Sequence, residues 1–305
     1  MMFSDSSSGV PFAKDPAVVR FGDRYLLYYS RPPLTGSDGW SIGIAESTDL
    51  DEWTIIGEIP ISQHCERNGI CAPGAIVLDG RVHVFYQTYG NGADDAICHA
   101  VSDDGTTFTK DPSNPVVSPT GDWNNGRAID ADLLAWDGRL FLYFATRDPR
   151  GVEQLQGVAT APLTSDFGRD AWTQACQAPI LAPELDWERQ CIEAAATCEH
   201  DGRLYLFYAG GYNNEPQQIG CAISDDGISW TRLFDRPFLS NGEPGSWNSS
   251  ESGHPYVFVD DDGDGRTHLF FQGNNDDGRT WYLSRVEVGW EDGLPRLVEV
   301  EPAER

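Results

Sequence analysis

The sequence FGDRYLLYYS, at residues 21–30, is followed by four further versions of the same phrase. Each version is a Gly/Asp turn, an arginine and then alternating aromatic and aliphatic residues. The later copies are LDGRVHVFYQT (78–88), WDGRLFLYFAT (136–146), HDGRLYLFYAG (200–210) and GDGRTHLFFQG (263–273). Asp-Gly between two apolar runs is a strong hairpin signal, because glycine readily adopts a positive φ. Each repeat unit is therefore predicted to begin with a β-hairpin.

The rest of each unit also recurs. A third strand is predicted at 41–47, 96–102, 157–163, 219–225 and 281–287, and three of these run into a phrase S-x-D-x-x-x-W/F. A fourth strand is expected to open at Trp53, Phe108, Trp172 and Trp230, with 296–302 as the last outer strand. Five units of four short antiparallel strands predict an all-β, five-bladed β-propeller in one domain, residues 1–305. A twisted sandwich is the alternative.

Charge and composition restrict the partners. The 305 residues include 21 Lys or Arg and 48 Asp or Glu, a formal net charge of −27. Such a field repels phosphate, so neither a nucleic acid nor a membrane is expected as partner. The opening residues lack the basic and apolar regions of a secretory signal, so a cytoplasmic protein is expected. The seven cysteines are expected to be reduced, with those in apolar runs buried: Cys98, Cys191, Cys198 and Cys221.

The repeat points to a site. The first strand of each propeller blade lines the central channel, and residues at its start gather around one mouth. We counted back nine positions from the repeat arginine in the first three units, ten in the fourth and twelve in the fifth, whose turn is longer. The residues found are Asp15, Ala72, Asp130, Glu193 and His254. A purely structural repeat is expected to carry similar small or apolar residues here.

Three carboxyl groups at one opening are costly, because like charges raise each other's pKa. Such a cost usually indicates function, and a solvated or ion-filled structural ring is the alternative. Glu193 lies in an apolar run (191–196), which favours the neutral form that a proton donor needs. Asp15 follows Lys14 and is held extended by Pro16, so it is the better candidate for a carboxylate that stays ionised.

Four short motifs resemble those of the five-bladed β-propeller glycosidases, the superfamily that holds glycoside hydrolase families 43, 32, 62, 68 and 117. Family 43 fits best. K-D-P (14–16) resembles its base motif and I-D (129–130) the motif of its second aspartate. I-E (192–193) resembles its acid motif, and G-H (253–254) resembles the motif of its channel histidine. Their order and spacing carry the resemblance, because each motif is only two or three residues long.

The resemblance implies a role for each of these residues. Asp15 is the general base that activates water, Glu193 is the general acid, and Asp130 tunes and orients Glu193. It implies no organic cofactor, and it makes His254 a candidate contact for a calcium or sodium ion in the channel. An inverting enzyme holds its base and acid roughly 6.5–9.5 Å apart, whereas about 5 Å would make Asp15 a nucleophile.

The sequence departs from the family pattern in two places. Ala-Ala follows Glu193, where family 43 usually has a small residue and then proline. Relatives in family 117 give the acid role to a histidine, so His254 is an alternative acid. An Arg-Asp-Pro at 147–149 follows a second strand and is interpreted as a loop. The acidic run at 260–265 lacks a glutamate at the twelfth position of a calcium loop and is interpreted as a turn.

Tryptophans recur ahead of three channel positions, in DWNNGRAID (122–130), DWERQCIE (186–193) and SWNSSESGH (246–254). Sugar rings present apolar faces that stack on indole, and their hydroxyls suit planar donors. The predicted substrate-binding residues are Trp123, Trp187, Trp247, Arg127, Arg189, Asn125 and His254. Packing of the tryptophans between blades is weighed equally, and Glu66, Arg67 and Asn68 are further polar candidates.

The function expected from these features is an exo-acting, inverting glycoside hydrolase that removes a terminal sugar from a small oligosaccharide. The resemblance favours an arabinofuranoside or xyloside, with fructosides and anhydro-galactosides as alternatives. A non-catalytic carbohydrate-binding propeller is the rival from another class. A phosphorylase is a third option, with Arg127 and Arg189 as its phosphate site. The oligomeric state is left open.

Overall fold

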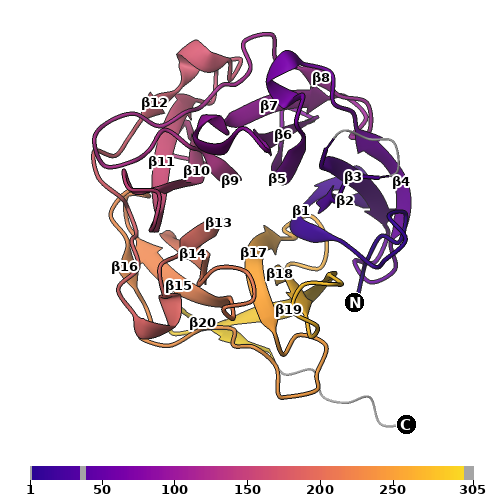
Figure 1. Cartoon of the computed structure of the whole chain (residues 1–305), viewed down its shortest axis with the longest axis vertical. Coiled ribbons are helices and arrows are strands. Elements are labelled where there is room, and N and C mark those ends of the chain that lie inside the picture. Colours follow the sequence, from indigo (N-terminus) through magenta and orange to yellow (C-terminus); the bar gives the residue numbers. More distant parts are fainter. Residues whose placement is uncertain (1, 35–38, 299–305) are drawn as a thin grey trace.

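Five four-stranded antiparallel sheets surround a central axis in the computed structural model, which describes residues 2–34 and 39–298 (Figure 1). Each sheet uses four consecutive strands, and the first strand of each lies nearest the axis (Figure 1). The propeller is thus confirmed, and the sandwich is excluded. The first blade consists of β1(Lys14–Phe21), β2(Arg24–Arg31), β3(Ser41–Ser47) and β4(Thr54–Ile59), and the second of β5(Ile70–Leu78), β6(Arg81–Thr88), β7(Ile97–Ser102) and β8(Thr109–Lys110). The third blade consists of β9(Ile129–Trp136), β10(Arg139–Arg147), β11(Gln154–Pro162) and β12(Thr173–Gln174), and the fourth of β13(Ile192–His200), β14(Arg203–Gly210), β15(Gln218–Ser224) and β16(Thr231–Arg232). The fifth blade consists of β17(Glu251–Val259), β18(Thr267–Asn274), β19(Tyr282–Glu291) and β20(Leu294–Leu297).

In the part of the chain that the structure describes, helical structure is confined to four single turns of 3-10 helix: η1(His64–Glu66), η2(Gly92–Asp94), η3(Arg169–Ala171) and η4(Asp186–Glu188). Within the described residues, none of the helices has the length and apolar character needed to cross a membrane. The cysteines are free thiols, and the four expected in the core are buried.

The repeated Asp-Gly turns connect the first two strands of the blades, as predicted. Asp79 and Gly80 both have positive φ, 49° and 73°, which is the backbone of a tight hairpin turn matched to the twist of its strands. In the fifth blade the longer acidic run also forms a turn, in which Asp260 accepts backbone N–H groups and the hydroxyl of Tyr25. The interpretation of this run as a turn is therefore confirmed.

The N-terminal segment closes the ring. Phe3 forms an antiparallel bridge with Leu283, and Phe12 forms a parallel bridge with Trp281, next to the third strand of the fifth blade. The last outer strand, β20, begins before the predicted 296–302. Residues 299–302 of that prediction lie outside the described residues.

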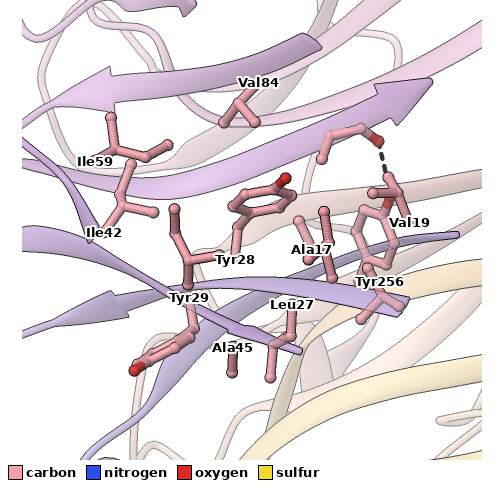
Figure 2. Packing of buried hydrophobic residues seen from close by; sticks show 14 of the residues in the cluster. Ala17, Val19, Leu27, Tyr28, Tyr29, Ile42, Ala45, Ile59, Val84 and Tyr256 are labelled. Carbon is pink, nitrogen blue, oxygen red and sulfur yellow. Dashed lines mark hydrogen bonds between the residues drawn. The ribbon is translucent and has the colours of Figure 1, made fainter. Parts of the chain in front are cut away.

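The hydrophobic core lies between neighbouring blades. In Figure 2, Tyr28 of β2 lies on the side of the strand that faces Val84 of the second blade, whereas Tyr29 points to the opposite side. The Tyr28 hydroxyl donates to the carbonyl of Gly105 in the next blade (2.8 Å). In this way a side chain that fills the core also connects adjacent sheets through a buried hydrogen bond.

The S-x-D phrase of the second blade is the turn whose Gly105 carbonyl accepts the hydroxyl of Tyr28. Ser102 Oγ accepts the N–H groups of Asp104 and Gly105, and Asp104 accepts those of Thr106 and Thr107. These backbone hydrogen bonds lower the pKa of Asp104 below its ordinary value. The Asp-Asp-Gly phrases are therefore turns held by serine and aspartate side chains.

Asp132, in the channel wall, joins the third and fourth blades. Its Oδ2 accepts both the N–H and the hydroxyl of Thr197 on β13 (2.9 and 2.6 Å). Burial raises the pKa of Asp132 to about 7, although these hydrogen bonds act against burial. The folded protein therefore binds this proton more tightly than the unfolded chain.

We expect Asp132→Asn to change how stability depends on pH. Because the folded pKa is raised, the contribution of Asp132 to the free energy of unfolding is lost as pH rises toward 7, by about 1.4 kcal/mol for each pH unit between the two pKa values. Urea denaturation near pH 5 and pH 8 should show the variant gaining stability relative to the parent at the higher pH. Asp137→Asn, on an exposed turn, is the control. A constant difference between variant and parent would contradict the prediction.

Candidate active site

Each innermost strand carries a β-bulge near its start, and the bulges shape the channel mouth. In β1 the pairing with β2 shifts between Lys14 and Ala17, and the other four blades show the same shift. The bulged residue has a positive φ in every blade, which is uncommon for residues other than glycine. These residues are Asp15 (51°), Ala72 (45°), Asp130 (54°), Ala194 (51°) and His254 (42°).

The structure corrects one position of the predicted repeat. Glu193 pairs with Ala209 as Lys14 pairs with Ser30, so Ala194 is the equivalent of Asp15. The sequence contained a signal for this, because Ala194 lies nine residues before Arg203, the spacing of the first three units. Glu193 therefore reaches the mouth from the residue before the bulge.

Polar side chains of the preceding blade hold the bulges. The N–H of Asp15 donates to Oε1 of Gln272 (3.1 Å), and the N–H of Asp130 donates to Oε1 of Gln87 (2.9 Å). Both glutamines lie on the second strand of the neighbouring blade. The bulges are thus held across blade boundaries, and this satisfies their buried N–H groups.

The predicted acids meet in one pocket. Asp15, Asp130, Glu193 and His254 all line a cavity of about 240 Å³ at this mouth. All four side chains are buried. The other lining residues are Lys14, Trp40, Cys71, Ala72, Gln87, Tyr89, Arg127, Ile129, Arg147, Gln154, Tyr212 and Asn213. The convergence expected from the repeat is therefore present.

Two glutamines fix the carboxylate of Glu193. Nε2 of Gln154 donates to Oε2 of Glu193, and Nε2 of Gln217 donates to Oε1, each at 2.7 Å. The amide oxygens have their own donors, Nε of Arg147 for Gln154 and the N–H of His254 for Gln217 (both 3.1 Å). Because both ends of each amide are used, the network sets which end faces Glu193.

Asp130 is the group that keeps a proton. Burial raises the pKa of Asp130 well above its ordinary value, and the charges of Glu193 and Asp15 raise it further. The positive charges of Arg127 and Lys14 act in the opposite direction. The prediction from sequence had placed the neutral carboxyl at Glu193 and had assigned no raised pKa to Asp130.

Asp15 lies between a cation and an imidazole. Nδ1 of His254 is 3.2 Å from Oδ1 of Asp15. Burial lowers the pKa of His254, although the charges of Asp15 and Glu193 act against burial, so the ring is neutral at neutral pH. Burial also acts to lower the pKa of Lys14, but Asp15, Glu251 and Glu193 outweigh it and raise that pKa. The lysine charge is thus stabilised by the acids around it.

The donor set for a cation is incomplete. Across residues 2–34 and 39–298, no group of three or more His, Cys, Asp or Glu side chains has a metal-binding arrangement. Nδ1 of His254 is directed at Asp15. These side chains alone supply too few ligands for a calcium or sodium ion at His254, and that ion stays a prediction.

The predicted tryptophans pack into the blades and do not line the pocket. The Trp187 ring stacks on Tyr208 at 5.9 Å, and Trp247 packs on Phe271 at 5.6 Å. Trp123 packs within the clusters of the third and fourth blades. A glycine lies beneath each ring, Gly210, Gly273 and Gly157 respectively, where a Cβ would clash with the indole. The packing alternative is therefore correct for all three.

Arg189 and Asn125 are also absent from the pocket lining, unlike Arg127. Arg189 is exposed and has a positive φ of 54°. Glu66 and its counterpart Glu188 are buried and accept the hydroxyls of Tyr86 and Tyr208 (2.6 and 2.7 Å). These glutamates hold the mouth loops against the blades.

Several pocket residues at the ends of the second strands are not among the site residues predicted from the sequence. Tyr89, Arg147 and Tyr212 come at or just after the ends of β6, β10 and β14. An aromatic or cationic residue immediately beyond a second strand was the available signal. Trp40 comes from the segment before β3 and lies 5.4 Å from Tyr89, ring to ring.

Known proteins resemble this chain over different lengths. Among curated proteins, the β-1,2-mannobiose phosphorylase of Thermoanaerobacter sp. (strain X514) is 28% identical over 151 residues. That match covers 43% of this chain and 47% of the relative, so it spans about half of that protein's length.

Two solved structures share the fold. A thermostable family-43 glycoside hydrolase has a TM-score of 0.75 at 20% identity, covering 99% of this chain and 98% of that one. The α-L-arabinofuranosidase of Lactobacillus brevis has a TM-score of 0.70 at 17% identity, covering 96% and 97%. The sequence profile of Glycosyl hydrolases family 43 matches residues 10–295, nearly the whole repeat. The chain therefore belongs to Glycosyl hydrolases family 43.

Proposed function

We propose that this protein is a glycoside hydrolase that removes one terminal sugar at a time and inverts the anomeric configuration. The observation that carries the proposal is the convergence of Asp15, Asp130 and Glu193 on one cavity of about 240 Å³. This volume is below the roughly 300–1,000 Å³ of common ligand pockets, and it suits one sugar ring better than a stretch of chain. A chain end is then the part of the oligosaccharide that enters.

Asp15 is the base in this proposal. It lies against the neutral ring of His254 and follows Lys14, whose charge favours a carboxylate beside it. As base, Asp15 takes a proton from a water molecule as that water attacks the anomeric carbon. The histidine fixes the side chain that orients the water.

Asp130 and Glu193 act as a pair that holds the proton for the leaving group. Because Asp130 has the raised pKa, the resting proton lies on Asp130. In the proposed mechanism Glu193 gives a proton to the glycosidic oxygen, which is the role that the resemblance implies, and Asp130 replenishes it. Direct donation by Asp130 is the second assignment, and the two amide donors that already face the oxygens of Glu193 support it.

The sugar is proposed to be an arabinofuranose or xylose at a chain end. The similar solved structure of an α-L-arabinofuranosidase supports this choice through the fold, and fructosides and anhydro-galactosides are the alternatives. The curated relative is named as a phosphorylase. Transfer of the sugar to phosphate is therefore the second candidate reaction.

The first prediction concerns the base. We expect Asp15→Asn to lower kcat by about 10²–10⁴-fold while leaving sugar binding within a few-fold, because general base catalysis typically supplies that factor. Asparagine tolerates the positive φ at this position, so the variant should fold. Steady-state kinetics on an aryl arabinofuranoside or xyloside and calorimetric binding of the free sugar give the two readouts.

Asp23→Asn is the matched control for Asp15→Asn, because Asp23 is exposed on the turn at the far end of β1. Full activity of Asp15→Asn would remove Asp15 from the mechanism. If the parent turns over no glycoside but binds sugars, the non-catalytic rival is favoured.

A second prediction separates the two proton donors. The variant that lacks the donor should be rescued by a leaving group that needs no proton, such as 2,4-dinitrophenolate, whereas the base variant should not. We expect Glu193→Gln to recover at least about tenfold more of its lost activity on the dinitrophenyl glycoside than on an alkyl glycoside. Rescue of Asp130→Asn instead would make Asp130 the donor.

A third prediction concerns stereochemistry. Proton NMR of the first-formed sugar should show a β product from an α-glycoside, because water attacks the face opposite the leaving group. The spectra are recorded before mutarotation mixes the anomers. A product of retained configuration would make Asp15 a nucleophile and would contradict the base assignment.

A further inference from the structure

Two arginines in the pocket have guanidinium groups that the described part of the chain does not saturate. Nε of Arg147 donates to Oε1 of Gln154 (3.1 Å), and its terminal nitrogens have no hydrogen-bond partner within residues 2–34 and 39–298. Nε of Arg127 lies 3.9 Å from Oδ2 of Asp95, too far for a hydrogen bond. Both side chains line the cavity with the catalytic acids.

Asn125 connects the backbones of the two arginines. Its N–H donates to the carbonyl of Arg147 (3.0 Å), and its Oδ1 accepts the N–H of Arg127 (3.2 Å). One asparagine on the mouth loop thus fixes the backbone of both cationic residues. Asn125 is a positioning residue that does not itself line the pocket.

Tyr212 packs against one of these cations. Cζ of Arg147 lies 5.7 Å from the centre of the Tyr212 ring, and the hydroxyl of Tyr212 donates to the carbonyl of Val152 (2.9 Å). Burial raises the pKa of Tyr212 to about 12, and the charges of Arg147 and Arg127 both act against burial. The Tyr212 ring therefore supports the Arg147 side chain at the pocket.

The positive side chains that line the cavity favour a negatively charged ligand. This protein has a net charge of −27, yet Lys14, Arg127 and Arg147 all line one small cavity. Lys14 is matched by the acids around it, whereas Arg147 forms no salt bridge within the described residues. A guanidinium group presents parallel N–H donors that match the two oxygens of a carboxylate, sulfate or phosphate.

We propose that Arg127 and Arg147 form an oxyanion subsite, which binds a carboxylate, sulfate or phosphate group carried by the terminal sugar of the substrate. The inference rests on the proposed glycosidase function of the same pocket and deepens it. It predicts that a terminal sugar carrying such a group, such as a uronic acid, binds more tightly than its neutral counterpart.

The position of the subsite favours an oxyanion on the substrate over a free one. Arg147 connects to Glu193 through Gln154, and Arg127 acts on the charge of Asp130. Both cations thus lie with the proton-donating pair. A free phosphate that replaced water would attack from the side of Asp15, forming a bond to the anomeric carbon as the glycosidic bond breaks and the leaving oxygen takes the proton.

The test is calorimetric binding at constant ionic strength of D-glucuronate, D-galacturonate and orthophosphate, each compared with D-glucose and D-galactose. We expect the parent to bind at least one uronate about tenfold or more tighter than its neutral counterpart. Arg127→Gln and Arg147→Gln should each bring the ratio of uronate affinity to neutral-sugar affinity down to about one, a ratio that a general loss of pocket binding does not change. Arg147→Lys should keep part of the uronate preference, because lysine keeps the positive charge but lacks the parallel N–H donors of the guanidinium group.

Arg189→Gln is the matched control, because Arg189 is an exposed arginine on the corresponding loop of the fourth blade. Thermal melting of every variant confirms folding, and the neutral-sugar arm does so at the pocket. Equal binding of uronates and neutral sugars by the parent would overturn the proposal, as would a preference that both Gln variants keep. Binding of orthophosphate without a uronate preference, together with formation of a sugar 1-phosphate seen by ³¹P NMR, would show that the arginines bind free phosphate. That result would contradict the proposal that the oxyanion is carried by the sugar.

Failure of this inference can be told apart from failure of the hydrolase proposal. Hydrolysis of neutral glycosides by a parent that shows no preference for uronates would remove the subsite and leave the hydrolase. Uronate binding that depends on both arginines, in a parent that hydrolyses no glycoside or uronide, would leave the subsite and remove the proposed reaction.

Discussion

The bulge at the start of each innermost strand is the constraint on which the site depends. A regular strand would point successive side chains to opposite faces, so a carboxyl group beside the channel would alternate with one inside a blade. The extra residue and its positive φ turn Asp15, Asp130 and His254 toward the mouth. Non-glycine residues in this conformation carry strain, which is typical of functional positions.

Glutamine side chains of neighbouring blades partly offset that strain by hydrogen bonding to the bulges. Gln272, Gln87 and Gln217 accept the bulge N–H groups of the following blade. Gln217 and Gln154 also hold the two oxygens of Glu193. Because each amide joins a bulge or a catalytic acid to a neighbouring sheet, the geometry of the acids depends on how the blades pack against one another.

Electrostatics inside the pocket differ from those of the whole chain. The surface charge is strongly negative, whereas three cations and three carboxyl groups line the pocket. Burial and two acidic neighbours keep Asp130 protonated, and in the proposed mechanism this proton serves the leaving group. Lys14 and the arginines stabilise the remaining charge and divide the pocket between the Asp15 side and the Glu193 side.

The sequence by itself predicted the propeller, because a phrase repeated five times defines five hairpin units, which a ring of small sheets explains better than a sandwich. It also identified Asp15, Asp130, Glu193 and His254, since a polar residue at a structural repeat position is visible in one chain. Only the tertiary structure decided that Glu193 precedes its bulge, that Trp123, Trp187 and Trp247 pack on glycines, and that Arg147, not Arg189, faces the acids. These outcomes depend on strand register and on contacts between blades, which join residues far apart in the chain and leave no local pattern.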